Sequence, residues 1–205
     1  MSWMSQYQNT SSRFKLNCTK EEAITILRAS FKAVVQMRGN KPEITPEIEK
    51  IIVEIASIMT SEHRKFGLML SGQCGNGKST MAKAVSNTIR ILSLAKRYDN
   101  PNLNVLTISA KEIARMSKEE TKRISNRILL SIDDFGNEPA EIQAYGNIWN
   151  PLVDLLEYRY DYQLFTIITT NLTPPQISEK YGMRITDRFR EMLNIIVFKG
   201  KSFRK

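Results

Sequence analysis

One short segment combines glycines, a lysine and a serine in the spacing of a phosphate-binding loop. In "SGQCGNGKST", Gly72, Gly77, Lys78 and Ser79 occupy the fixed positions of the pattern G-x-x-x-x-G-K-S. Glycines let the backbone curl so that its N–H groups point at phosphate oxygens. The ammonium of Lys78 can then reach the β- and γ-phosphates, and the hydroxyl of Ser79 can bind Mg²⁺. We therefore expect ATP and Mg²⁺ to bind at a loop formed by Gly72, Gln73, Cys74, Gly75, Asn76, Gly77, Lys78, Ser79 and Thr80.

Polar residues also follow two later apolar runs. Asp133 and Asp134 come after "ILLSI", and Asn171 comes after "TIITT". In an open parallel sheet, ligands bind at the carboxyl ends of the strands. Asp133 is then a candidate for the Mg²⁺ shell, Asp134 for orienting or deprotonating a water, and Asn171 for a hydrogen bond to that water or to the γ-phosphate. The alternatives are two acids that cap a turn and an asparagine that belongs to one.

The elements that would position these residues form a regular alternation. Nearly continuous apolar runs predict strands at 66–72, 103–109, 127–133, 164–171 and 194–200. Continuous rather than alternating apolarity indicates strands covered on both faces, as in parallel α/β sheets. The segments between them, 77–97, 110–125, 142–161 and 173–192, are expected to contain the crossover helices. The fold class is therefore α/β, with a five-stranded parallel sheet between helices.

Before this core, the sequence predicts a tail and a helical hairpin. Residues 1–17 are rich in serine, glutamine and asparagine, which is typical of a flexible tail. In residues 18–63, Thr19 and Glu22 form a capping box for one helix, and Thr45 with Pro46 starts a second. Both helices carry an apolar stripe, so the hairpin must pack on the core, residues 64–205, or on a partner.

Composition favours a polyanionic partner. The chain has a formal charge of +9 and a sequence pI near 9.6, which favours nucleic acid over a membrane surface; the alternative is a solvated basic surface without a ligand. The cysteines, Cys18 and Cys74, lack disulfide or zinc spacing, which fits a cytoplasmic protein. No apolar run approaches the length of a membrane span.

Together these segments resemble the AAA+ ATPases of the DnaC/DnaI helicase-loader and IstB-like family. The resemblance covers about residues 64–204 and is carried by "GQCGNGKST", "LLSIDDFGNE", "EYRYDYQLFTIITTNL" and "YGMRITDRFR". It implies that Lys78 and Ser79 bind phosphate and Mg²⁺, that Asp133 and Asp134 are the Walker B acids, and that Asn171 is the sensor. It also makes Arg188 a finger that acts on a neighbouring subunit's nucleotide, with Arg184 as a second candidate for that interface. The alternative is an arginine on a helix surface in an ordinary exposed salt bridge, which we expect of Arg190.

The resemblance implies an ATPase that forms an ATP-dependent homo-oligomer, binds single-stranded DNA and delivers a replicative helicase. The IstB-like alternative serves a transposase.

Two departures from the family pattern affect these expectations. Asp134 stands where glutamate is common, which predicts slow hydrolysis or a non-hydrolysing switch, and few residues follow the last strand, so no C-terminal helical lid is expected. A P-loop small-molecule kinase is a further alternative.

Overall fold

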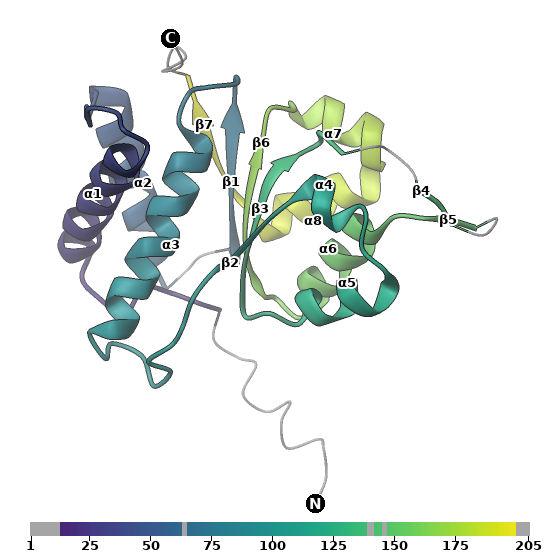
Figure 1. The fold of residues 1–205 in the computed structure, drawn as a ribbon, viewed down its shortest axis with the longest axis horizontal. Helices are drawn as coiled ribbons and strands as arrows, with labels where there is room; N and C mark the ends of the chain where they lie inside the picture. Colours follow the sequence, from purple (N-terminus) through teal and green to yellow (C-terminus); the bar gives the residue numbers. More distant parts are fainter. Residues whose placement is uncertain (1–12, 63–64, 139–141, 145–146, 200–205) are drawn as a thin grey trace, which may run out of the picture.

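A five-stranded parallel sheet forms the centre of the protein (Figure 1). The computed structural model describes residues 13–62, 65–138, 142–144 and 147–199. The strand order is β2-β3-β6-β1-β7, and every neighbouring pair is parallel. The strands are β1 (Gly67–Gly72), β2 (Leu106–Ser109), β3 (Leu129–Phe135), β6 (Phe165–Thr170) and β7 (Asn194–Phe198). All five predicted strands are confirmed, which confirms the α/β fold class.

Helices cover both faces of the sheet (Figure 1). One face carries α1 (Lys20–Met37), α2 (Pro46–Thr60) and α3 (Lys78–Leu94). The other carries α4 (Ala110–Ile113), α6 (Pro151–Asp161), α7 (Pro174–Tyr181) and α8 (Met183–Met192). In β1, Leu68 and Leu70 pack into the first core and Met69 into the second. Burial on both sides explains why the strands read as continuous apolar runs.

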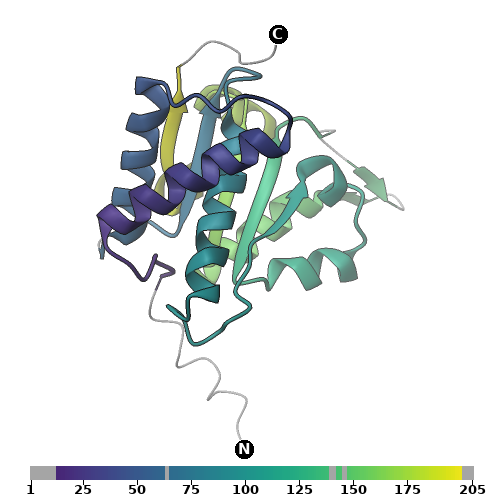
Figure 2. The ribbon, with the colours of Figure 1, turned by 60° about the vertical axis from the view of Figure 1, so that its left-hand side comes forward.

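The N-terminal helices begin where the sequence predicts and pack on the core. Thr19 and Glu22 form the capping box of α1, and the Thr45 side chain caps α2. Figure 2 shows α1 lying across α3, and both N-terminal helices contribute to the core cluster that contains α3. Residues 13–17 differ from the flexible tail that we expected: Leu16 is buried, and its N–H donates to the Met59 carbonyl at 2.8 Å. The rest of that predicted tail, residues 1–12, lies outside the described residues.

Three predicted helical segments are interrupted, and one of them, 173–192, divides at Gly182 into α7 and α8. Segment 110–125 forms α4 and then α5 (Lys118–Ser125), which has its own capping box from Ser117. Segment 142–161 begins with the antiparallel strands β4 (Ile142–Ala144) and β5 (Asn147–Trp149), and only then enters α6. Asn150 caps α6 by accepting from two backbone N–H groups, which fixes the helix start at Pro151. No helix in the described part of the chain has the length and apolar character needed to cross a bilayer.

Candidate nucleotide-binding site

The glycine-rich loop joins the end of β1 to the start of α3 at the carboxyl edge of the sheet (Figure 1). Gly72 has φ +146°, and a Cβ there would lie 2.4 Å from the Phe198 carbonyl oxygen. Gly77, the N-cap of α3, has φ +96°. Both positions therefore require glycine. The loop turns directly into a helix N-terminus, whose free N–H groups and dipole favour an anion.

Lys78 lies on the inner side of this loop. Its ammonium donates to the carbonyl oxygens of Gly72 and Gln73 at 2.7 and 2.6 Å and to Asn76 Oδ1 at 3.2 Å. These acceptors resemble the oxygens of a phosphate, so a bound triphosphate can exchange with them. Asn76 is 1% exposed, and its Nδ2 donates to the Phe198 carbonyl at 2.9 Å. This contact ties the loop to β7, and no local pattern predicts it because Asn76 occupies a variable position of the phosphate-loop pattern.

Three elements meet at the carboxylate of Asp133. Ser79 Oγ, from the first turn of α3, donates to Asp133 Oδ1 at 2.8 Å. Thr169 Oγ1, from β6, donates to the same oxygen at 2.5 Å. A hydroxyl and a carboxylate side by side fit Mg²⁺, which prefers oxygen ligands and usually takes only one or two from the protein. The structure thus brings together the two residues that the sequence singled out as metal ligands, and their role in binding Mg²⁺ stays a prediction.

A β-bulge places Asp134. Ile132 pairs with Ile168 and Phe135 with Thr170, so two residues of β3 stand opposite Thr169 alone. Asp134 adopts φ +56°, and its N–H donates to Thr169 Oγ1 at 2.9 Å. The bulge leaves the Asp134 side chain exposed beside the half-buried Asp133. Thr169 therefore positions both acids, and no sequence pattern predicts this role because a buried threonine in a strand looks like a packing residue.

Asn171 lies at the same edge. It directly follows Thr170, the last residue of β6, and is exposed. Because β6 runs between β1 and β3, the position of Asn171 falls between the phosphate-binding loop and the acids. The turn is held by Thr170 Oγ1, which donates to the Phe135 carbonyl at 2.7 Å and accepts from the Leu172 N–H at 3.0 Å. Asn171 therefore lies between the loop and the acids, and its role as a sensor stays a prediction.

A second cation touches the loop. Arg38, at the end of α1, donates from Nη1 to Thr80 Oγ1 at 2.7 Å. The two residues are 42 positions apart, and no local pattern announces the contact. It joins the N-terminal helix to the residue next to Ser79.

The turn after the acids is fixed by a buried glutamate. Glu138 is 4% exposed, accepts from the Gly136 N–H at 2.9 Å and lies 3.2 Å from Lys180 Nζ. Lys180 also donates to the Gly136 carbonyl at 2.7 Å, and Tyr181 donates to the Glu138 carboxylate. Glu138 therefore anchors this turn to α7, and its contacts are structural.

The predicted finger lies elsewhere. Arg188 and Arg184, both on α8, contact Oε1 of Glu157 on α6 at 2.8 and 3.1 Å. The short Arg188 contact is an ion pair without hydrogen-bond alignment. Arg188 also lies over the Tyr160 ring, 5.1 Å from its centroid. These contacts are on the opposite face of the sheet from α3, away from the chain's own loop. Arg190 forms an exposed pair with Asp187, as expected of a surface residue.

The strand order separates the phosphate-binding loop from the acids. An additional strand, β6, separates the strand of the loop, β1, from the strand of the acids, β3. A DnaI structure superposes with a TM-score of 0.60 at 24% identity, covering 88% of this chain and 93% of that one. The chain has an AAA+ fold.

Further comparisons agree with the AAA+ fold. The DnaC helicase loader gives a TM-score of 0.57 at 19% identity, covering 78% of this chain and 94% of the other. AMPPCP-bound DnaA from Aquifex aeolicus gives 0.52 at 16% identity, covering 75% of this chain and 48% of that one. A scan of protein-family models and a search of curated proteins found no match. At these identities the likeness establishes the fold, which confirms at that level the DnaC/DnaI resemblance expected from the sequence.

Proposed function

We propose that the protein binds and hydrolyses ATP as an AAA+ assembly factor, and that it loads a replicative helicase onto single-stranded DNA. The observation that carries this proposal is the hydrogen bond between Ser79 and Asp133, which joins the phosphate-binding loop to the acids at one edge of the sheet. Support for the replication role comes from the similar structures, DnaI and the DnaC helicase loader.

Each candidate side chain has its own role in the proposed hydrolysis of ATP. Lys78 and the N–H groups of the loop bind the phosphates of ATP, and Ser79 and Asp133 would hold Mg²⁺, which would neutralise phosphate charge. Asp134 orients the attacking water and accepts its proton as the oxygen bonds to the γ-phosphorus and the bond to ADP breaks. Asn171 donates to the γ-phosphate or positions the water. Asp134 is one methylene shorter than the glutamate common at this position, so we expect slow turnover.

The site is completed between subunits. Arg188 faces α6 rather than its own loop, so the γ-phosphate of one subunit would be met by Arg188 of the next. ATP binding then favours a homo-oligomer because nucleotide lies in the interface. ATP binding would form that interface and hydrolysis would break it. Breaking the interface would release the helicase.

DNA binding follows from charge and from the proposed class. The formal charge of +9 favours a polyanionic partner. We propose the cytoplasm as the location of the protein. Residues 18–63 and 64–205 form the proposed N-terminal segment and ATPase core. Fluorescence anisotropy with a labelled single strand tests this step: we expect tighter binding with ATP than with ADP and a steep loss with salt. Absence of binding at low salt with ATP would contradict it.

The helicase assignment is tested by affinity purification of the native protein with ATP and Mg²⁺, with Lys78→Ala as the matched control. Recovery of the replicative helicase by wild type alone supports the loader. Recovery of a transposase in its place supports the IstB-like alternative.

A non-hydrolysing switch is the second candidate, favoured by the short and exposed Asp134. It predicts ATP-dependent partner binding with no phosphate release above the background of an Asp134→Asn variant.

A further inference from the structure

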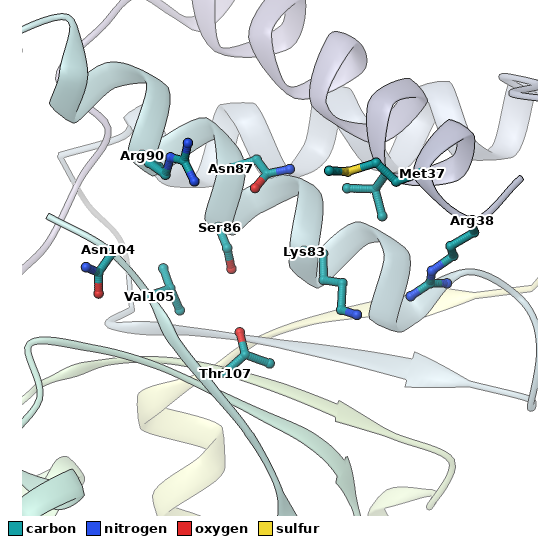
Figure 3. A pocket seen from close by; sticks show the side chains of 10 residues that line it. Met37, Arg38, Lys83, Ser86, Asn87, Arg90, Asn104, Val105 and Thr107 are labelled. Atoms are coloured by element: carbon teal, nitrogen blue, oxygen red, sulfur yellow. The ribbon is translucent and has the colours of Figure 1, made fainter. Parts of the chain in front are cut away.

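A basic groove lies beside the nucleotide site, between α1, α3 and the edge strand β2 (Figure 3). Its volume is about 540 Å³. Figure 3 shows α3 contributing a row of side chains along one wall, with Asn104 and Thr107 facing them from the segment around β2. Arg38 closes the end nearest the start of α3. The groove is therefore built from three elements that are distant in the sequence.

The charge of this groove is uncompensated. Arg38, Lys83 and Arg90 line it, and none of its lining residues is acidic. Lys83 and Arg90 are exposed, and within the described part of the chain neither makes an ion pair or a side-chain hydrogen bond. Most exposed cations of a globular protein need no ligand, but three around one recess keep a high local potential. The recess therefore attracts an anion.

The arrangement fits an extended polyanion better than a single small anion. Lys83 and Arg90 are seven residues apart on one side of α3, about 10 Å along the helix axis. Asn87 lies between them, and Asn104 and Thr107 lie opposite, so neutral donors and acceptors separate the charges. A row of this kind matches successive phosphates with sugars and bases between them. The groove is recessed, which suits a single strand rather than a duplex that must be contacted from outside.

The groove also touches the phosphate-binding loop. Arg38, which lines it, donates to Thr80 Oγ1 at 2.7 Å, and Thr80 is adjacent to Ser79. A ligand in the groove would thus contact Arg38, and a nucleotide on the loop would contact its hydrogen-bond partner Thr80. This hydrogen bond gives a physical route by which the nucleotide state could alter affinity in the groove.

We propose that the groove between α1, α3 and β2 binds the phosphate backbone of single-stranded nucleic acid. This inference rests on the nucleic-acid binding in the proposed function and gives that binding a location. No aromatic side chain lines the groove, so base stacking contributes little there. Binding should therefore be insensitive to sequence and strongly salt-dependent. Single-stranded DNA and RNA share the backbone chemistry, and the experiment separates them.

The test compares double variants by fluorescence anisotropy with labelled oligothymidine and oligouridine, with ATP and Mg²⁺, at several salt concentrations. Lys83→Ala/Arg90→Ala removes two charges from the groove. Lys20→Ala/Lys50→Ala removes two exposed charges from the far end of α1 and from α2. Lys122→Ala/Arg123→Ala removes two from α5, a competing basic surface. Thermal unfolding and ATP affinity are measured for each variant to confirm an intact fold.

We expect the groove variant to bind several-fold more weakly, and the slope of log affinity against log salt to fall by about 1.4, or about 0.7 for each lost phosphate contact. The Lys20/Lys50 control should keep the wild-type slope. Equal losses for both oligonucleotides show recognition of the shared backbone, and a loss with one alone identifies the ligand. The groove is not the binding site if its variant binds the oligonucleotides as tightly as the control does while wild type binds, or if only the α5 variant loses affinity. In either case the proposed function stands. If wild type binds ATP but neither oligonucleotide, both fall.

Discussion

Arg188 on α8 and Glu157 on α6 form an ion pair within one chain, with Nη1 and Oε1 2.8 Å apart. The Arg188 side chain is only 16% exposed and also lies over the Tyr160 ring. To act on a neighbour's γ-phosphate, its guanidinium would have to leave both contacts. Each is worth about 0.5–1 kcal/mol at a partly exposed site. The proposed finger is thus restrained by contacts within its own chain.

Removing the charge of Glu157 should release the finger. We expect Glu157→Gln to raise the ATPase rate at limiting protein concentration about two- to fivefold, which corresponds to the loss of an ion pair of about 0.5–1 kcal/mol. Phosphate release measured against protein concentration checks this. Asp187→Asn, which disrupts the exposed pair with Arg190 on the same helix, is the control and should change little. A lower rate for Glu157→Gln would mean that the pair holds Arg188 in its working position instead.

Lys78 should dominate nucleotide binding. Its ammonium already lies among the carbonyl oxygens of the loop, so it is positioned for phosphate without rearrangement of the backbone. We expect Lys78→Ala to weaken ATP binding at least about tenfold, equivalent to about 1.4 kcal/mol. Titration calorimetry measures this directly. Lys83→Ala, five residues further along α3, should bind ATP like wild type, and equal affinities for all three proteins would refute the nucleotide site.

The loop, the acids and the positions of the five strands along the chain could be predicted from the sequence, because each has a local pattern. Gly72 and Gly77 are required by backbone geometry, and Asp133 and Asp134 mark a strand end. The contact between Arg38 and Thr80 could not be predicted, because it depends on how α1 crosses α3. Bulges are equally hidden, since the pairing of β3 with β6 at Thr169 leaves no trace in the apolar pattern.

A buried arginine joins several elements of the core. Arg159 on α6 is 0% exposed and donates to three backbone carbonyls, those of Ser125, Arg127 and Phe165, and to Thr166 Oγ1. Burial lowers the pKa of its guanidinium to about 9, so it is still charged at neutral pH. It ties α6 to β6 and to the segment after α5, and no carboxylate compensates it within the described residues.

Replacing this arginine should be costly. Arg159→Met keeps much of the volume but leaves buried acceptors without donors, at about 1–3 kcal/mol for each one left unsatisfied. We expect a loss of about 3 kcal/mol or more in the free energy of unfolding, measured by urea denaturation. Arg159→Lys, which can satisfy part of the set, should be intermediate. Arg190→Met at an exposed position should stay within about 0.5 kcal/mol of wild type. An unchanged urea midpoint for Arg159→Met would show that the acceptors find other partners.

An arginine finger that acts on a neighbouring subunit predicts a result that a site complete within one chain does not. If Arg188 stabilises charge developing on a neighbour's γ-phosphate, its loss abolishes hydrolysis without touching the loop, its lysine or the acids. Fingers of this kind contribute about 10³–10⁵ in rate in well-studied GTPases, and a slow enzyme is expected to show less. Arg188→Ala should therefore bind ATP like wild type and hydrolyse it hardly at all. Lys78→Ala should fail at both, because its loop is impaired while its finger is intact.

Mixing the two inactive proteins separates a finger acting in trans from a structural arginine. In a mixed oligomer, some interfaces pair the intact loop of an Arg188→Ala subunit with the intact finger of a Lys78→Ala subunit, so part of the ATPase activity should return. Light scattering or fluorescence transfer between labelled subunits confirms that mixed oligomers form, and a mixture of Lys78→Ala with Lys78→Ala/Arg188→Ala is the matched control that contains no intact loop. If mixed oligomers form and activity stays at the level of this control, Arg188 does not complete a neighbour's site, and nucleotide energy must be used within a single subunit.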